Sequence, residues 1–447
     1  MNTKQRIDAI REKALELMTE HHVPGISIGL IVDGTEHYIP LGVTSIDNPL
    51  EVTPDTLFQI ASVTKTFTAS IAMKLVELGK LELDATVRTY IPSFKLQDES
   101  VAARVTVRHL LTHTSGFMGD FDIDTGDGKD ALERFVEHLV DFPQLVPLDS
   151  LAQYSNSAFC LLGRLIEIAS GKTLDVTARE LLLEPLGLHD TVYWAHEAIV
   201  KRTSVGHKQS EEEQTVVIQK WRMPRLDQAD GSLSSTARDL MKYARFHMGQ
   251  LGDDLLSSAT RAAMQKPGPA FSSTDSVGLC WFVSRYEETN VIGHGGDVDG
   301  FHAQLSLVPA HNFAVSIQTN SDGGGQARTD LLKFALETFL GLKKPEPQAI
   351  PTTAQQLEEF VAWYVLPTGN PEDGIEISLE QDVLHVRVNV PSFSMILPAM
   401  AMNKIAPDVF TPTDGPMAGT EIEFVRSEAR VKFLRAAGRI SIRQDQP

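Results

Sequence analysis

The chain has 447 residues, of which 42% are hydrophobic and 22% charged, and its 59 acidic and 40 basic side chains give a net charge of −19. This length and composition are typical of a globular protein with more than one domain. An acidic surface repels nucleic acid and anionic membranes, so we expect neither as a partner.

The first predicted element is an amphipathic helix over residues 1–18, which carries charges throughout and lacks the apolar core of a secretory signal. No other stretch has the length and hydrophobicity of a membrane span. Cys160 and Cys280 lie in apolar runs, where we expect buried free thiols rather than a disulfide. These features predict a cytoplasmic protein.

Two groups of predicted strands flank a long helical region. Residues 25–43 contain two strand patterns joined at Asp33-Gly34, a hairpin dipeptide. Helical patterns dominate from 59 to about 260, and strand patterns return near 280–320. We expect one antiparallel sheet with an N-terminal and a C-terminal helix on one face and an inserted all-α subdomain. The predicted fold class is α/β, of the α+β kind.

The last hundred residues show a different sequence pattern. Residues 342–356 contain three prolines and no apolar periodicity, which indicates a linker. Beyond them, short alternating segments such as VLHVRVNV predict a small all-β domain with a barrel-like sheet. The predicted organisation is a first domain over 1–341, a linker over 342–356 and a β-domain over 357–447.

The segment QIASVTKTF, residues 59–67, contains the first candidate for chemistry. Ser62 and Lys65 are three residues apart, so they share one face of the helix predicted to follow. Unpaired N–H groups at a helix start stabilise an oxyanion, and burial in an apolar helix should lower the pKa of Lys65 until it can accept the Ser62 proton. The alternative is a capping serine and a solvated lysine, because this spacing often arises by chance.

Two later motifs supply the partners that such a serine needs. Tyr154-Ser155-Asn156 stands at a predicted loop-to-helix junction and offers a phenol for proton transfer and an amide for orientation. His294-Gly295-Gly296 lies on a predicted strand, where glycines let a ligand lie against the backbone.

In order and spacing, these three motifs closely resemble those of the serine β-lactamase and penicillin-binding-protein superfamily, which are S-x-x-K, Y-x-N and K-T-G or a variant. The similarity is greatest to the class C-type branch, which the segments LLTHTSGF (110–117) and DGSLSSTARDL (230–240) also resemble. The resemblance covers roughly residues 10 to 340. It implies a β-lactamase-like sheet flanked by helices.

The resemblance also implies a role for each matched residue. Ser62 would be the nucleophile, Lys65 and Tyr154 would share the proton shuttle, and which of these two is the base stays open. The oxyanion hole would be formed by the backbone N–H groups of Ser62 and Asp297. An acyl-enzyme would follow, with no metal or organic cofactor. The substrate-binding positions implied are Asn156, which would also hold Lys65, and His294, Gly295, Gly296 and Asp297.

The sequence departs from the lactamase pattern at His294 and Gly295, which replace a lysine and a threonine. A mostly neutral imidazole anchors a carboxylate weakly, although it could hydrogen-bond the Tyr154 phenol, and Gly295 would leave space for a bulkier acyl chain. We therefore expect a peptidase acting on short peptides or amino-acid amides. The alternatives are a carboxylesterase, a weak β-lactamase or D,D-peptidase, and a catalytically silent penicillin-binding sensor.

Metal binding is not predicted. His109 and His113 have the spacing of two zinc ligands on a helix, but the glutamate of an H-E-x-x-H site is absent. The aspartate-rich segment 119–130 only loosely resembles a calcium loop, because its glycines fall at the wrong positions. The stereochemistry of the substrate and self-association through the C-terminal domain are left open.

Overall fold

A seven-stranded antiparallel sheet organises the first 340 residues in the computed structural model, which describes residues 1–121, 123–221, 224–344, 348–368, 370–393 and 395–444. Its strand order is β2-β1-β11-β10-β9-β8-β7. The N-terminal hairpin meets the later strands because β1 pairs with β11, with Ile28 opposite Ile317. This sheet is the one predicted. The strand bounds are β1 Gly25–Val32, β2 Thr35–Gly42, β7 Asp275–Val277, β8 Phe282–Tyr286, β9 Thr289–Val298, β10 Phe301–Val308 and β11 Phe313–Thr319.

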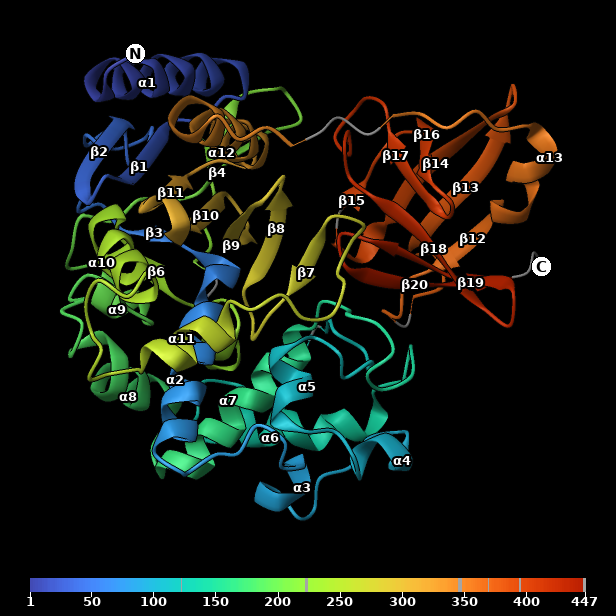
Figure 1. Ribbon diagram of the computed structural model, residues 1–447, viewed down its shortest axis with the longest axis horizontal. Coiled ribbons are helices and arrows are strands. Elements are labelled where there is room, and N and C mark those ends of the chain that lie inside the picture. Colours follow the sequence, from blue (N-terminus) through green and yellow to red (C-terminus); the bar gives the residue numbers. More distant parts are fainter. Residues whose placement is uncertain (122, 222–223, 345–347, 369, 394, 445–447) are drawn as a thin grey trace.

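The two terminal helices of this unit cover one face of the sheet, as expected. Helices α1 (Thr3–Glu20) and α12 (Gly324–Leu340) lie side by side in Figure 1. Their buried residues, among them Ile10, Leu17 and Leu331, form one apolar cluster with Ile28 and Ile317 of the sheet. The amphipathic pattern of α1 therefore serves to bury the sheet.

Helices inserted between β2 and β7 cover the opposite face. Helix α2 (Thr64–Glu77) is buried along most of its length and packs against α7 (Asn156–Ser170), while α10 (Ala237–His247) packs against β1 and β11. The other helices here are α3 Val87–Tyr90, α4 Glu99–Ala102, α5 Val107–Leu111, α6 Ala131–His138, α8 Leu174–Ala178, α9 Ala195–Ala198 and α11 Ser258–Met264, with short turns η1 Ala61–Val63, η2 Leu139–Asp141, η3 Arg179–Leu183 and η4 Arg225–Ala229.

Two small strand pairs interrupt this helical region and were not predicted. β3 (Phe58–Gln59) pairs with β6 (Ser234–Ser235), and β4 (His207–Gln209) pairs with β5 (Thr215–Val217). Strands of two or three residues are too short to show an alternating pattern in sequence. The β3–β6 pair matters for the site, because η1 and the segment around Ser62 follow β3 directly.

A β-barrel follows and confirms the predicted all-β architecture. Among the described residues, eight strands close in the order β13-β12-β20-β19-β18-β17-β16-β14, β13 pairs back to β14, and β15 adds to β14 outside the ring. Figure 1 shows the barrel beside the β7 edge of the sheet. The strands are β12 Ala362–Val365, β13 Gly374–Glu380, β14 Val383–Val390, β15 Met395–Ile396, β16 Met400–Ala406, β17 Val409–Pro412, β18 Ile422–Ser427, β19 Arg430–Ala436 and β20 Arg439–Gln444.

The segment between the two units is partly structured. Residues 345–347 of the predicted linker lie outside the described residues, as do 122, 222–223, 369, 394 and 445–447. Helix α13 (Ala354–Leu357) starts inside the predicted linker, because Thr353 and Gln356 form a capping box. The turns η5 Pro309–His311, η6 Glu358–Phe360 and η7 Pro391–Phe393 complete the short elements.

Two simpler expectations can be compared with the structure. Cys160 and Cys280 are buried free thiols, as predicted. Within the described residues, no helix combines the length and the apolar character needed to cross a membrane.

The barrel has an apolar core of its own, so we predict that it unfolds as a separate unit. Phe360 is 1% exposed and packs against Phe410 and Phe424 with ring centroids 5.1 and 4.6 Å away. Phe360→Ala should cost the barrel about 3–5 kcal/mol and lower one of two calorimetric transitions. Ile442→Ala, at a side chain 39% exposed, is the control with a small effect. Equal shifts of both transitions would show one cooperative unit instead.

Buried neutral histidines should make the protein sensitive to acid. Burial, aided by the charge of Arg261, lowers the pKa of His247 to about 3, whereas an unfolded histidine titrates near 6.5. The unfolded state then binds more protons below pH 6.5, so stability is lost as the pH falls through that value. His247→Gln should lose about 2 kcal/mol less than wild type between pH 7 and 5 in urea unfolding. The exposed-site control His189→Gln should behave like wild type, and equal losses in both variants would contradict the prediction.

Candidate active site

Ser62 and Lys65 lie at the tight connection between β3 and α2. Ala61 has a positive φ of 42°, an uncommon conformation for a residue other than glycine, and Ser62 follows it in the short turn η1. Lys65 is in the first turn of α2, and its Nζ lies 3.2 Å from Ser62 Oγ. The predicted pairing along one helix face is present in the structure.

Lys65 is completely buried, and its main partner was not predicted. Nζ donates a hydrogen bond to the Asp230 carbonyl at 2.8 Å and lies 3.6 Å from Asp230 Oδ2. Burial acts to lower the pKa of Lys65, but the neighbouring Tyr154 phenol and the Asp230 carboxylate raise it, and the net direction is upward. The expected fall toward neutrality is therefore wrong, because these partners outweigh desolvation.

Tyr154 lies between Lys65 and the end of the barrel. The Lys65 Nζ is 5.0 Å from the Tyr154 ring centroid, and the His113 ring stacks on the same ring at 4.8 Å. Burial raises the pKa of Tyr154, while the Lys65 charge and hydrogen bonds with Ser62 and Lys65 oppose that effect. The half-buried Ser62 hydroxyl, the buried ammonium and the buried phenol therefore form one group.

Asn156 does not hold Lys65, contrary to expectation. It is the first residue of α7, and its Nδ2 donates to Asp120 Oδ1 at 2.7 Å. A carboxylate is a strong acceptor for this amide, and Lys65 is already bonded to Asp230. Asn156 Oδ1 is buried without a hydrogen-bond partner among the described residues.

Strand β9 brings the third motif against the serine. A Cβ on Gly296 would lie 2.1 Å from the Ile60 carbonyl oxygen and 2.9 Å from the Ser62 backbone nitrogen, so only glycine fits there. A Cβ on Gly295 would lie 3.2 Å from Gln304 Oε1 and 3.6 Å from Arg328 Nη1. The open space predicted beside Gly295 is therefore partly filled by these two side chains.

His294 is buried and neutral. The hydrogen bond to the Tyr154 phenol that the sequence suggested is not formed. Its Nδ1 donates to the Gly295 carbonyl at 2.6 Å, and Nε2 is buried without a partner among the described residues. Burial, followed by the charge of Lys65, lowers its pKa to about 3. The ring packs on Phe282 at 5.1 Å between centroids.

Asp297 has a partly exposed carboxylate that is held by His302 and Arg328. Oδ1 accepts from His302 Nδ1 at 2.5 Å and from Arg328 Nη1 at 2.7 Å. Burial of the carboxylate acts against ionisation, but the His302 and Arg328 contacts prevail and lower its pKa to about 2. The Asp297 carboxylate thus bonds Arg328 of α12, whereas the neighbouring Gly296 faces Ser62.

Sequence reasoning missed four residues of this site. Asp230 begins the segment DGSLSS, which was noticed without a role for its carboxylate, and Asp120 lies in the acidic segment interpreted as a loop. His113 accepts from the Ser155 backbone N–H at 3.1 Å, so it supports the Tyr154 loop. Arg439, whose guanidinium lies 5.2 Å from the Tyr154 ring centroid, belongs to the barrel and left no signal in the sequence.

The two histidines considered as zinc ligands have other roles. His109 Nδ1 accepts from the Thr106 backbone N–H at 3.0 Å at the start of α5, while His113 supports the Tyr154 loop. Within the described ranges, no three His, Cys, Asp or Glu side chains come together in a way that could hold a metal ion. Asp122, part of the acidic segment, lies outside those ranges.

Comparison with known proteins identifies the family of the chain. The model of the family described as β-lactamase matches residues 10–339. Penicillin-binding protein 4 of Amycolatopsis lactamdurans is 33% identical over 365 residues, which cover 79% of this chain and 94% of that protein. The unguisins hydrolase ungD' of Aspergillus campestris is 28% identical over 336 residues, covering 69% of this chain and 61% of the relative. The chain thus spans only about six tenths of the latter's length.

Solved structures share the fold, and some share both units. The crystal structure of SurE has a TM-score of 0.79 and 26% identity and covers 99% of this chain and 100% of its own. The octameric penicillin-binding protein homologue of Pyrococcus abyssi has a TM-score of 0.66 at 23% identity, covering 100% and 99%. A class C β-lactamase has a TM-score of 0.63 at 22% identity, covering 74% of this chain and 97% of its own. The chain belongs to the β-lactamase family and is a hydrolytic enzyme of that family.

Proposed function

We propose that the protein hydrolyses amide or ester bonds through an acyl-enzyme on Ser62, and that its substrates are short peptides or amino-acid amides. The observation that carries this proposal is the group formed by Ser62, Lys65 and Tyr154, with Ser62 Oγ and Lys65 Nζ 3.2 Å apart. A hydroxyl, a fixed cation and a phenol in contact are the parts that nucleophilic catalysis needs.

The charge of Lys65 favours Tyr154 as the general base. Because the pKa of Lys65 is raised, its ammonium donates to Ser62 Oγ and cannot accept the serine proton. Burial, the largest effect, raises the pKa of Tyr154, and the positive charges of Lys65 and Arg439 oppose that rise. In this proposal the phenol first releases its proton to solvent, and the phenolate that the two charges stabilise is the remaining acceptor. In this proposal Tyr154 takes the proton as Ser62 attacks the carbonyl and later gives it to the leaving group.

The oxyanion hole is proposed at the backbone N–H groups of Ser62 and Asp297. Support comes from Gly296, which brings β9 against the Ser62 backbone. Two fixed N–H donors would stabilise the tetrahedral oxyanion more than the ground-state carbonyl, which lowers the barrier. Asn156 Oδ1, buried without a partner among the described residues, is proposed to accept a substrate N–H.

The charges around the site support substrates without a carboxylate beside the scissile bond. His294 is neutral, and Arg439 is paired with Asp120, with Nε 2.6 Å from Oδ2. A β-lactam carboxylate would therefore meet little positive charge here. SurE is also known in a complex with D-Leu, and another relative is named a hydrolase of unguisins. The complex with D-Leu fits an amino-acid or peptide substrate, and the second name supports hydrolysis. Carboxylester hydrolysis is the second candidate. Self-association remains a prediction.

Ser62→Ala should abolish turnover and labelling by a fluorophosphonate probe, because the nucleophile is lost. The loss of one hydroxyl at a helix start costs at most about 1–2 kcal/mol, so the fold should survive. The matched control is Ser257→Ala at the N-cap of α11, which should keep activity and labelling. Activity in Ser62→Ala, or a wild type that no serine probe labels, would refute the mechanism or indicate a silent binding protein.

Tyr154→Phe and Lys65→Ala should each lower kcat/KM by about 10²–10⁴-fold, the range for one proton-transfer group. The double variant should be little worse than either single one, because the Lys65 charge acts through the proton transfer by Tyr154. Losses that multiply would show that the two groups act independently.

Nitrocefin should be a poor substrate, with kcat/KM below about 10⁵ M⁻¹s⁻¹, because the site lacks a fixed cation for its carboxylate. Amino-acid p-nitroanilides and p-nitrophenyl esters should be hydrolysed faster by the same preparation. The comparison uses initial rates at pH 7, with Ser62→Ala as the blank. A faster reaction with nitrocefin than with every amide and ester would make the protein a β-lactamase.

A further inference from the structure

The barrel sends one tight turn to the catalytic tyrosine. Strands β19 and β20 are joined at Ala437 and Gly438, both in the left-handed region with φ of 47° and 75°. The Gly438 carbonyl accepts a hydrogen bond from the Tyr154 backbone N–H at 2.8 Å. The backbone position of Tyr154 is thus fixed directly by the barrel.

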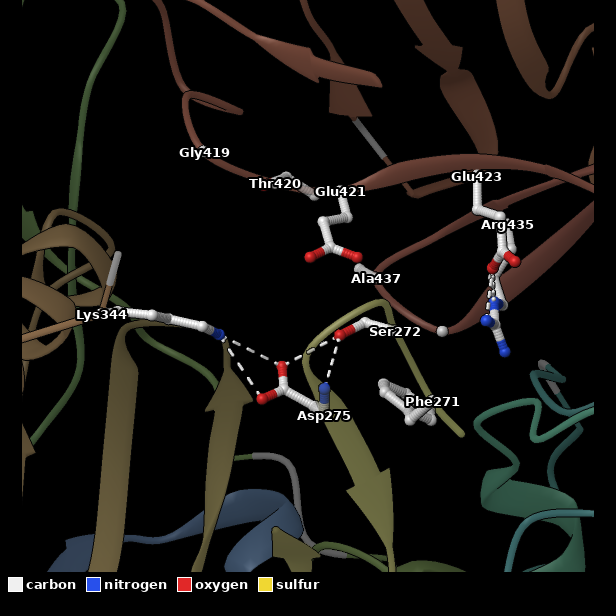
Figure 2. A pocket seen from close by; sticks show the side chains of 11 residues that line it. Phe271, Ser272, Asp275, Lys344, Gly419, Thr420, Glu421, Glu423, Arg435 and Ala437 are labelled. Carbon is white, nitrogen blue, oxygen red and sulfur yellow. Dashed lines mark hydrogen bonds and ion pairs between the residues drawn. The ribbon is translucent and has the colours of Figure 1, made fainter. Parts of the chain in front are cut away.

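The Gly438 turn packs closely against the ring of Phe271. A Cβ on Gly438 would lie 2.0 Å from Phe271 Cζ, so even a methyl group would push the Phe271 ring aside. Figure 2 shows Phe271 below the strand that carries Ala437, at one side of a cavity of about 240 Å³ between the two units. Phe271 in turn packs on Phe282 at 4.6 Å, and Phe282 packs on His294. A series of contacts through Phe271 and Phe282 therefore links Gly438 to His294.

Arg439 connects the barrel to two residues of the Y-x-N motif. Its guanidinium lies 5.2 Å from the Tyr154 ring centroid, and its Nε donates to Asp120 Oδ2 at 2.6 Å. The other oxygen of that carboxylate accepts from Asn156 Nδ2 at 2.7 Å. One arginine thus contacts Tyr154 directly and orients Asn156 through Asp120.

Two further contacts hold the hairpin itself in place. Arg435 Nη1 donates to the Ala152 carbonyl at 3.0 Å and to the Ala270 carbonyl at 3.4 Å. Ile440, 1% exposed, packs with Leu145 and Val146 of the catalytic unit. The hairpin is therefore joined to the catalytic unit by contacts on both sides of Tyr154.

We propose that the β19–β20 turn of the barrel is a positioning element of the active site, in which Gly438 fixes the Tyr154 backbone and Arg439 orients the Tyr154 ring and Asn156. The site is then complete only with the barrel in place. The proposal rests on the proposed role of Tyr154. It assigns no contact between Gly438 or Arg439 and the substrate.

The test compares two positions in the turn with matched positions elsewhere in the barrel, in the full-length protein. Gly438→Ala is paired with Gly419→Ala, because Gly419 has nearly the same φ (77°) but open space around it. Arg439→Gln is paired with Arg426→Gln, whose arginine forms ion pairs with Glu359 and Asp408. Arg439→Lys keeps the positive charge and tests whether that charge preserves kcat and the pH profile.

We expect Gly438→Ala to lower kcat by about 100-fold with a smaller change in KM, since a displacement of about 1 Å costs that much. Arg439→Gln should lower kcat and move the acidic limb of the pH profile to higher pH, and Arg439→Lys should reverse part of both effects. The charged or titratable groups around Tyr154 are Lys65 with Asp230, Arg439 with Asp120, His113 and His294. Arg426→Gln and Gly419→Ala should match wild type.

A second measurement does not depend on activity. In protein labelled with ¹³C at tyrosine Cζ, the Tyr154 resonance, assigned with Tyr154→Phe, should shift at pH 7 in Gly438→Ala and Arg439→Gln but not in the two controls. If Gly438→Ala does not fold, Arg439→Gln still decides, because its side chain is 43% exposed. Unchanged kcat, pH profile and resonance would overturn the proposal.

The two proposals can fail separately. The turn variants could shift the Tyr154 resonance in a protein whose activity does not need Ser62. That result would refute the proposed function but support the positioning role of the turn. If activity needs Ser62 and Tyr154 but the turn variants behave like wild type, the proposed function is supported and the positioning role is refuted.

Discussion

The active site depends on one buried charge, the ammonium group of Lys65. Its side chain has no contact with solvent, so every partner must come from the protein, and an unpaired ammonium there would be very costly. Ser62, the Asp230 carbonyl and carboxylate, and the Tyr154 ring meet this need from three separate segments. The packing of α2 against α7 and of β9 against η1 brings these segments together.

The partners of Lys65 also decide its charge. Burial acts to lower its pKa, but a carboxylate oxygen at 3.6 Å and a carbonyl at 2.8 Å stabilise the ammonium. In a site of low dielectric such contacts are strong, and they exceed desolvation here. With Lys65 as a fixed cation, the proposed proton-accepting role falls to Tyr154, so the surroundings of Tyr154 matter most for the proposed chemistry.

Those surroundings extend beyond the family domain. The β-lactamase family match ends at residue 339, yet Tyr154 bonds Gly438 and lies under Arg439. The similar class C β-lactamase covers 74% of this chain, whereas SurE and the Pyrococcus abyssi protein cover nearly all of it. The arrangement with a barrel beside the sheet is thus shared within the fold, and the site should be studied with both units present.

The sequence alone determined the sheet, the covering helices, the barrel and the three motifs, because hydrophobic periodicity and short-range spacing are local properties. Ser62 and Lys65 meet as predicted because three residues span one helical turn. The partners of Lys65 and Asn156, the charge of Lys65 and the approach of Arg439 were decided only by tertiary structure. Asp230 is 165 residues from Lys65 and Arg439 is 319 residues from Asp120, and no local pattern records which distant side chains a buried charge will meet.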